Sequence, residues 1–312
     1  MNFTLSTLAV LLVTAGGAIA GPAKPSRSLV VVPPSDVAGA RVIEAPGQIP
    51  VQASTDRIAP APREAGSDKA QLAFDGCMAY RQEVTLPSCT YGDRSSTESV
   101  LLFGDSRAMQ YFPAILPLAR RHHWKLTGLV RADCVASLVD YERYCDAWKE
   151  NMLERIEKRV RPDLVVLGSA TKSLYRVNRN GATLSREASQ PYLVRGMVRL
   201  IRRLEATGAK VVVMRDQSTA PFTPSDCVAR NIHHLRRCAF VPASRRERAF
   251  ELTAARRTGI KAIDAQPMFC SRRLCPAVIG DAIVNKDNYH LTATYSRTLA
   301  RWMSGQLPAF GD

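Results

Sequence analysis

The sequence predicts a three-layer α/β/α sandwich built around a parallel sheet, and three observations support this. Short, continuously apolar segments, typical of strands buried on both faces, recur in the second part of the chain. Amphipathic helical patterns separate them, and strands that alternate with helices form parallel sheets covered on both sides. Residues 73–312 are also enough for one such domain with a sizeable core.

Residues 1–20 have the form of a secretory signal peptide. The segment from Phe3 to Val13 is largely apolar, and Ala18-Ile19-Ala20 offers the small residues of a cleavage site. Only the terminal amine supplies positive charge ahead of it, so an uncleaved membrane anchor is the alternative. The segment is shorter than the ~20 residues of a spanning helix, which favours cleavage. We therefore expect a periplasmic or secreted protein.

Residues 21–72 differ in composition from the rest of the chain. They are rich in Pro, Ala, Ser and Val, with Pro33-Pro34, Pro60 and Pro62, and they show no sustained helical period. Such a composition is typical of a flexible linker. We predict a disordered tether over 21–72, followed by a single domain over 73–312.

The first predicted strand, Val100–Phe103, is apolar throughout. The helix after it is irregular, because Pro113 and Pro117 must start, kink or break it. The remaining predicted strands are Leu126–Val130, Asp163–Leu167, Lys210–Met214 and Ile260–Ile263.

Helical patterns fill the gaps between the later strands. They cover Ala147–Arg159, Tyr192–Ala206 and Arg245–Arg256. A final helix over about residues 292–303 places Tyr295, Leu299, Trp302 and Met303 on one face.

Eight cysteines, all beyond the signal segment, agree with export to an oxidising compartment. None has the Cys-x-x-Cys spacing of zinc ribbons or redox motifs, and sequence alone does not decide how eight cysteines pair. Buried thiols are the alternative to disulfides. The simplest prediction is four local disulfides that pin loops: Cys77–Cys89, Cys134–Cys145, Cys227–Cys238 and Cys270–Cys275.

The formal net charge is +15, and arginine doublets are scattered along the chain. One interpretation is attraction to an anionic polymer or lipid headgroup. We favour a solvated basic surface. No aromatic-interleaved basic motif or zinc finger indicates nucleic acid, and export argues against it.

One serine and one histidine carry the candidate chemistry. Ser106 ends Gly104-Asp105-Ser106, directly after the first strand, and His290 ends Asp287-Asn288-Tyr289-His290, just before the last helix. A serine hydroxyl becomes a good nucleophile when a neutral imidazole takes its proton, and that imidazole needs a carboxylate to fix its tautomer. We therefore predict a catalytic triad of Ser106, His290 and Asp287. Phosphate-binding loops and metal-ligand spacings are missing from the sequence, so we expect neither cofactor nor metal.

With these motifs, the chain resembles the SGNH (GDSL-like) hydrolase superfamily, above all the periplasmic SGNH domain attached to acyltransferase-three membrane proteins that O-acetylate surface glycans. The resemblance covers most of residues 74–312 and implies an SGNH or flavodoxin-like sheet, with Ser106 as nucleophile, His290 as base and Asp287 as its orienter. It rests on Phe103–Ala108 with the following Pro113-Ala114, the cysteine couple ahead of them, Ala132-Asp133-Cys134, and Asp287–Thr292.

Two positions depart from the family pattern. The family often has histidine directly after the serine, where this chain has Arg107. The superfamily also offers an asparagine side chain to the oxyanion, whereas the third strand here ends in Gly168-Ser169-Ala170-Thr171. We predict that the Ser106 backbone N–H, together with Gly168 or Ser169, forms the oxyanion hole. The Ala132–Cys134 loop is an equal candidate.

The sequence thus predicts a serine-dependent ester hydrolase, an O-acetyl esterase acting on a cell-envelope glycan or another small ester. The first alternative is an O-acyltransferase that works with a separate membrane acyltransferase as acyl donor. The second is a glycan-binding domain that has kept the SGNH fold without catalysis. We expect a monomer in every case.

Overall fold

The structure is a computed structural model that describes residues 29–170, 176–242 and 249–310. The predicted signal segment lies outside these ranges. Within them, no helix is long and apolar enough to cross a membrane.

The predicted parallel sheet is confirmed, and it contains all five predicted strands. A short parallel strand, β3 (Met78–Ala79), and an antiparallel one, β4 (Thr90–Gly92), both pair with the edge of β6. The five predicted strands lie side by side in the order β11 (Lys261–Ile263), β10 (Lys210–Met214), β7 (Leu164–Gly168), β5 (Ser99–Gly104) and β6 (Lys125–Arg131), with β11 at the other edge of the sheet.

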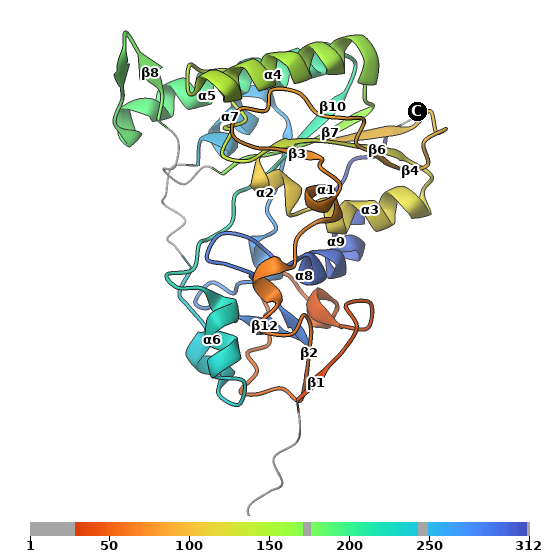
Figure 1. Cartoon of the computed structure of the whole chain (residues 1–312), viewed down its shortest axis with the longest axis vertical. Coiled ribbons are helices and arrows are strands. Elements are labelled where there is room, and N and C mark those ends of the chain that lie inside the picture. Colours follow the sequence, from red (N-terminus) through yellow and green to blue (C-terminus); the bar gives the residue numbers. More distant parts are fainter. Residues whose placement is uncertain (1–28, 171–175, 243–248, 311–312) are drawn as a thin grey trace, which may run out of the picture.

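Helices cover both faces of this sheet, which makes the three layers of the predicted sandwich (Figure 1). Alternate residues of each strand point to opposite faces, so Leu101 and Phe103 join one core while Val100 and Leu102 join the other. The first face carries α4 (Arg143–Arg155), α5 (Arg186–Glu205) and α7 (Phe250–Thr258). The second carries α2 (Ser106–Met109), α3 (Phe112–Arg121), α8 (Ala293–Thr298) and α9 (Ala300–Ser304).

The helices differ from the predicted ranges mainly at their ends. The predicted helix 147–159 begins at Arg143 behind the capping carboxylate of Glu142, and its last residues form a π-helical turn, η3 (Ile156–Val160). The predicted final helix is divided at Leu299. Residues 245–248 of the predicted helix 245–256 lie outside the described ranges, and the rest of that helix is found in α7.

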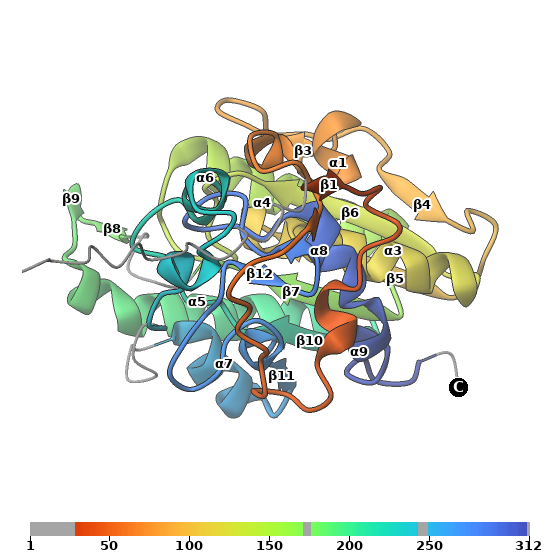
Figure 2. The ribbon, with the colours of Figure 1, turned by 90° about the horizontal axis from the view of Figure 1, so that it is seen from below.

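Residues 29–72 differ from the predicted tether, because the structure packs them onto the domain. β1 (Val30–Val31) pairs with β2 (Arg57–Ile58), and Val37 and Ile58 are fully buried. Figure 2 shows this red-to-orange segment crossing the lower surface, where its short helix η1 (Gly39–Val42) contacts α8 and β12. Apolar Val, Ile and Ala side chains fill that surface without any regular period, and composition alone did not indicate this.

Side chains of the C-terminal part hold the same segment by its backbone. The Ala40 N–H donates to Thr298 Oγ1 at 2.8 Å, and the Ala38 N–H donates to Asp281 Oδ1 at 2.6 Å. Irregular backbone can be buried where side chains satisfy its polar groups, as they do here. The other elements of this region are η2 (Ala65–Ser67) and α1 (Gln71–Phe74).

The four predicted local disulfides are all present: Cys77–Cys89, Cys134–Cys145, Cys227–Cys238 and Cys270–Cys275. Each ties a loop to an element or loop close by in the chain. The third joins α6 (Pro224–Arg230) to η4 (Leu235–Cys238). The remaining elements are two small hairpins and a short helix: β8 (Asn178–Arg179) with β9 (Ala182–Thr183), β12 (Val278–Ile279) with β13 (Ala282–Ile283), and η5 (Gln266–Met268).

Candidate active site

The tight turn between β5 and α2 presents Ser106 as the first residue of a helix. Gly104 has φ +139°, a conformation that favours glycine. A Cβ atom built at Gly104 would lie 1.8 Å from the Gly168 carbonyl oxygen, so only glycine lets the two strand ends approach this closely. Asp105 then caps the helix by accepting a hydrogen bond from the Arg107 N–H at 2.8 Å.

The Asp105 carboxylate also joins this turn to the end of β7. It is fully buried, and its Oδ2 accepts the Ala170 N–H at 2.8 Å and the Ser169 hydroxyl at 3.3 Å. Two neighbouring strand ends are thereby held together at the carboxyl edge of the sheet, where α/β enzymes place their chemistry.

The three predicted triad residues lie within hydrogen-bond distance of one another. His290 Nε2 is 2.9 Å from Ser106 Oγ, although the two residues are 184 positions apart. His290 Nδ1 is 3.0 and 2.9 Å from the two carboxylate oxygens of Asp287. If Nδ1–H donates to Asp287, the Nε2 lone pair faces the serine hydroxyl, as general-base catalysis requires.

The loop Asp287–His290 is shaped by the same carboxylate. Asp287 Oδ1 accepts the backbone N–H groups of Tyr289 and His290, both at 2.7 Å, and Lys286 Nζ lies 2.6 Å from Oδ2. Partial burial alone would raise the pKa of Asp287, but its hydrogen bond to His290, together with the charges of His290 and Lys286, holds the pKa well below its usual value. The carboxylate therefore stays ionised beside the imidazole.

Arg107, one of the two predicted departures from the family pattern, occupies a buried position next to the nucleophile. Its side chain is 3% exposed, and Nε lies 3.3 Å from Oδ1 of Asp216, whose side chain is 1% exposed. Nη1 donates to the carbonyl of Tyr289, the residue before the histidine, and Gln217 Nε2 donates to the same oxygen at 3.1 Å. The arginine thus ties the nucleophile turn to the histidine loop.

Asp216 and Gln217 were missed in the sequence. The only signal that could have found them is their place directly after Met214 and Arg215, at the carboxyl end of a strand. That edge collects functional side chains in this kind of sheet.

The predicted oxyanion residues lie close to the turn. Ser106 opens α2, and the first N–H groups of a helix have no intrahelical partner. Gly168 lies opposite Gly104 in the sheet register. The Ser169 hydroxyl accepts the Ala136 N–H at 3.1 Å and donates to Asp105. The donor roles of Gly168 and Ser169 stay predictions, and Thr171 lies outside the described residues.

Among the residues that the structure describes, no group of three His, Cys, Asp or Glu side chains is placed to hold a metal ion. The candidate site consists of the serine, the imidazole, the carboxylate and the side chains that hold their loops. This is the donor set of nucleophilic acyl transfer.

Most of the chain matches a known protein family. A sequence model of the family described as "SGNH domain (fused to AT3 domains)" matches residues 72–304, about three quarters of the chain. A search of curated protein sequences finds no match.

Solved structures similar to this chain include the periplasmic domain of a lipopolysaccharide acetyltransferase from Salmonella ser. Paratyphi A. It is 13% identical, with a TM-score of 0.57 over 80% of this chain and 97% of that one. A carbohydrate acetylesterase from Sinorhizobium meliloti, Est24, is 14% identical, with a TM-score of 0.42 over 67% of this chain and 97% of that one.

Proposed function

The chain belongs to the family of SGNH domains that occur fused to AT3 domains, and from that premise we propose that it is a serine-dependent enzyme that cleaves acetyl esters of a cell-envelope glycan. The observation that carries this proposal is the contact of three side chains. His290 lies 2.9 Å from Ser106 Oγ through Nε2 and 2.9 Å from Asp287 Oδ2 through Nδ1. The three side chains supply a nucleophile, a base and an orienter in contact.

The reaction proceeds in two halves. Ser106 Oγ attacks the ester carbonyl carbon while His290 Nε2 takes the hydroxyl proton, and the carbonyl oxygen becomes an oxyanion. The tetrahedral intermediate then expels the sugar oxygen, which receives that proton from His290, and an acetyl-serine remains. A water molecule, deprotonated by His290, attacks the acetyl-serine in the same way and releases acetate.

The oxyanion needs donors that are in place before the reaction. The Ser106 N–H, at the positive end of α2, is our first assignment, and the Gly168 N–H or the Ala132–Cys134 loop would supply the second. Removing one such donor from a hydrolase costs about 10²–10³-fold in rate. Turnover therefore depends on how firmly the turn holds the Ser106 amide.

Transfer to a sugar hydroxyl is the second candidate function. The family's fusion to AT3 domains favours it, as does the likeness to a lipopolysaccharide acetyltransferase domain. In that case a separate membrane acyltransferase would supply the acetyl group and a glycan hydroxyl would replace water in the second half. The four disulfides agree with work in the periplasm or outside the cell.

The test is hydrolysis of 4-nitrophenyl acetate by the purified, oxidised chain beside its Ser106→Ala and His290→Ala variants. We expect the wild type to release nitrophenol and both variants to fall to background while circular dichroism stays unchanged. Turnover that survives in either folded variant would refute the triad.

Acetate and acetylated sugar are then measured with an added glycan acceptor. Acetate as the main product supports hydrolysis, and acetylated acceptor supports transfer. A folded wild type that turns over neither ester nor acceptor, yet binds glycan equally well as Ser106→Ala, would identify a binding domain.

A further inference from the structure

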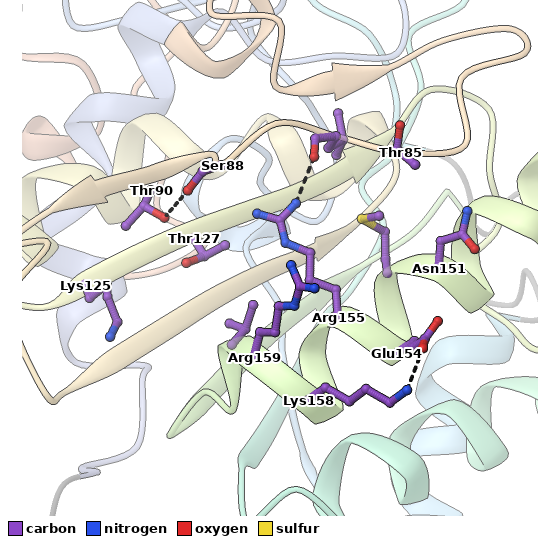
Figure 3. A pocket seen from close by; sticks show the side chains of 13 residues that line it. Thr85, Ser88, Thr90, Lys125, Thr127, Asn151, Glu154, Arg155, Lys158 and Arg159 are labelled. Atoms are coloured by element: carbon purple, nitrogen blue, oxygen red, sulfur yellow. Dashed lines mark hydrogen bonds and ion pairs between the residues drawn. The ribbon is translucent and has the colours of Figure 1, made fainter.

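A polar hollow of about 730 Å³ opens between the edge strands and the end of α4 (Figure 3). Its volume lies within the range of ligand sites in proteins. β4, β6 and the loop before β4 form one wall, and α4 and η3 form the other. The polar and charged residues lining it are Thr85, Ser88, Thr90, Lys125, Thr127, Asn151, Glu154, Arg155, Lys158 and Arg159.

This hollow lies at the opposite end of the sheet from the nucleophile. Lys125 is in register with Ser99, the first residue of β5, whereas Ser106 follows Gly104 at the last. Five residues of strand at ~3.3 Å each separate the two levels by about 17 Å. The hollow is therefore separate from the triad.

Four cations face one carboxylate in this lining, and that carboxylate is already engaged. Glu154 accepts from Lys158 Nζ at 2.6 Å, and in Figure 3 Lys158 turns toward it. Within the described part of the chain, neither the Arg159 guanidinium nor the Lys125 ammonium has a hydrogen-bond or ion-pair partner. Two positive groups remain available to an anion.

Arg155 also lines the hollow, and its side chain holds the wall made by the loop before β4. Its Nη1 donates to the carbonyls of Leu86 and Pro87 at 2.9 and 3.0 Å, which fixes the loop before β4 against α4. Burial and the neighbouring charge of Arg159 lower the pKa of Arg155. A bound anion would relieve this crowding of like charges.

The helix end that carries these residues has an unusual conformation. Ile156–Val160 forms a π-helical turn, which is rare and is found frequently at functional sites. Arg159 and Val160 reach the hollow from this turn. In Figure 3 the Arg159 side chain rises from the helix end into the hollow, beside Arg155.

From this lining we infer that the hollow binds an anionic sugar unit of a glycan, one that carries a carboxylate or a phosphate. Arg159 and Lys125 would hold the anion, and the hydroxyls of Ser88, Thr90 and Thr127 would bond to the sugar hydroxyls. A membrane surface would need basic groups that project from the protein rather than line a hollow. Nucleic acid would need aromatic rings for its bases, and none of the described lining residues is aromatic.

If the proposed esterase or transferase function holds, this site would anchor an acidic polymer while a distant unit reaches Ser106. Anchoring raises the local concentration of ester at the triad without changing the chemistry. The site would then lower KM for an acidic polymeric substrate and leave turnover of a small ester unchanged.

The direct test is calorimetric binding to the Ser106→Ala chain, which holds no active triad. The probes are trigalacturonic acid and glucose 6-phosphate, beside neutral maltotriose and inorganic phosphate. We expect one or both acidic sugars to bind, and maltotriose and bare phosphate to bind at least tenfold more weakly. Binding of trigalacturonic acid would identify a carboxylate as the bound group, and binding of glucose 6-phosphate would identify a phosphate.

Two matched double variants decide where binding occurs. Lys125→Gln with Arg159→Gln should weaken binding at least tenfold. Arg256→Gln with Arg257→Gln removes the same charge from the exposed last turn of α7 and should leave binding unchanged. An equal loss in both pairs, binding of bare phosphate as tight as that of the sugars, or no binding of either acidic sugar by the folded protein would each overturn the inference.

A second measurement separates this inference from the proposed function. For an acetylated acidic polysaccharide, the Lys125/Arg159 variant should show a raised KM with unchanged kcat, and unchanged hydrolysis of 4-nitrophenyl acetate. If the wild type hydrolyses nothing yet binds the acidic sugar through Lys125 and Arg159, the catalytic proposal fails and the binding site stands. If anionic phospholipid vesicles bind to the protein and the acidic sugars do not, the inference that the ligand is a glycan is wrong.

Discussion

Replacing Asp287 by asparagine should reverse the tautomer of His290. Oδ1 of Asp287 accepts two backbone N–H groups at 2.7 Å, so in Asp287→Asn the single side-chain oxygen must take that position. The amide NH₂ then occupies the place of Oδ2, 2.9 Å from His290 Nδ1, and can only donate to it. The retained oxygen also lies 3.0 Å from Nδ1, but it already accepts two backbone N–H groups. We therefore expect Nδ1 to accept from the amide, so that the ring proton moves to Nε2.

An Nε2–H group cannot take the proton of Ser106, which lies 2.9 Å away. A carboxylate-to-amide change of this kind in a serine triad lowers kcat by about 10⁴-fold. That is about 5 kcal/mol of transition-state stabilisation. The new NH₂ also faces the Lys286 ammonium, 2.6 Å from the former Oδ2, so the loop loses one attraction as well.

Two measurements test this reasoning. Nitrogen NMR of labelled histidine should show the Nδ1–H tautomer in the wild type and the Nε2–H tautomer in Asp287→Asn. Hydrolysis of 4-nitrophenyl acetate should fall by three to four orders of magnitude. An unchanged tautomer, or a loss of less than about tenfold in a folded variant, would show that Asp287 does not orient the imidazole.

The other predictions concern the supporting residues. Gly104→Ala should lower the free energy of unfolding by about 2–5 kcal/mol in urea titrations, since its Cβ would meet the Gly168 carbonyl at a positive φ; an unchanged midpoint would contradict this. Arg107→Met should cost about 3–5 kcal/mol of stability, because the buried Asp216 carboxylate loses its arginine partner. It should also lower kcat more than it raises KM, because the Tyr289 carbonyl keeps only Gln217 as a side-chain donor; wild-type kcat would refute a positioning role. Folding lowers the pKa of Asp287, so its carboxylate stabilises the folded protein fully above the ordinary carboxyl pKa of about 4, and this contribution fades as the pH falls below that value. The difference in unfolding free energy between wild type and Asp287→Asn should therefore shrink between about pH 5 and pH 2.

The sequence was most informative where local pattern and chemistry coincide. Buried parallel strands such as Val100–Phe103 are apolar throughout, so their composition alone marks them. Cysteines 5 to 12 residues apart pair locally because their loops are short. The candidate triad could be predicted because a strand–turn serine and an Asp-x-x-His motif have few other combined uses.

The remaining features depend on contacts between distant segments. Residues 29–72 lack any period, and their burial depends on a surface made by residues beyond 280. The pair Arg107–Asp216 joins positions that are adjacent only because β5 and β10 both end at the same edge of the sheet. The residues of the π-helical turn Ile156–Val160 form no sequence pattern that differs from that of an ordinary α-helix end.

The motif Gly104-Asp105-Ser106 has a separate task for each residue, and this explains how the missing asparagine is accommodated. Gly104 permits contact with Gly168, Asp105 binds the end of β7, and Ser106 begins the helix. The superfamily offers an asparagine side chain to the oxyanion, and the end of the third predicted strand here has none; its Ser169 hydroxyl donates to Asp105 instead. We therefore expect oxyanion stabilisation here to depend on backbone N–H groups. The Ser106 N–H and the nucleophile share one turn, and Asp105 binds that turn to the end of β7. Any change that loosens Asp105 should therefore weaken attack and oxyanion binding together.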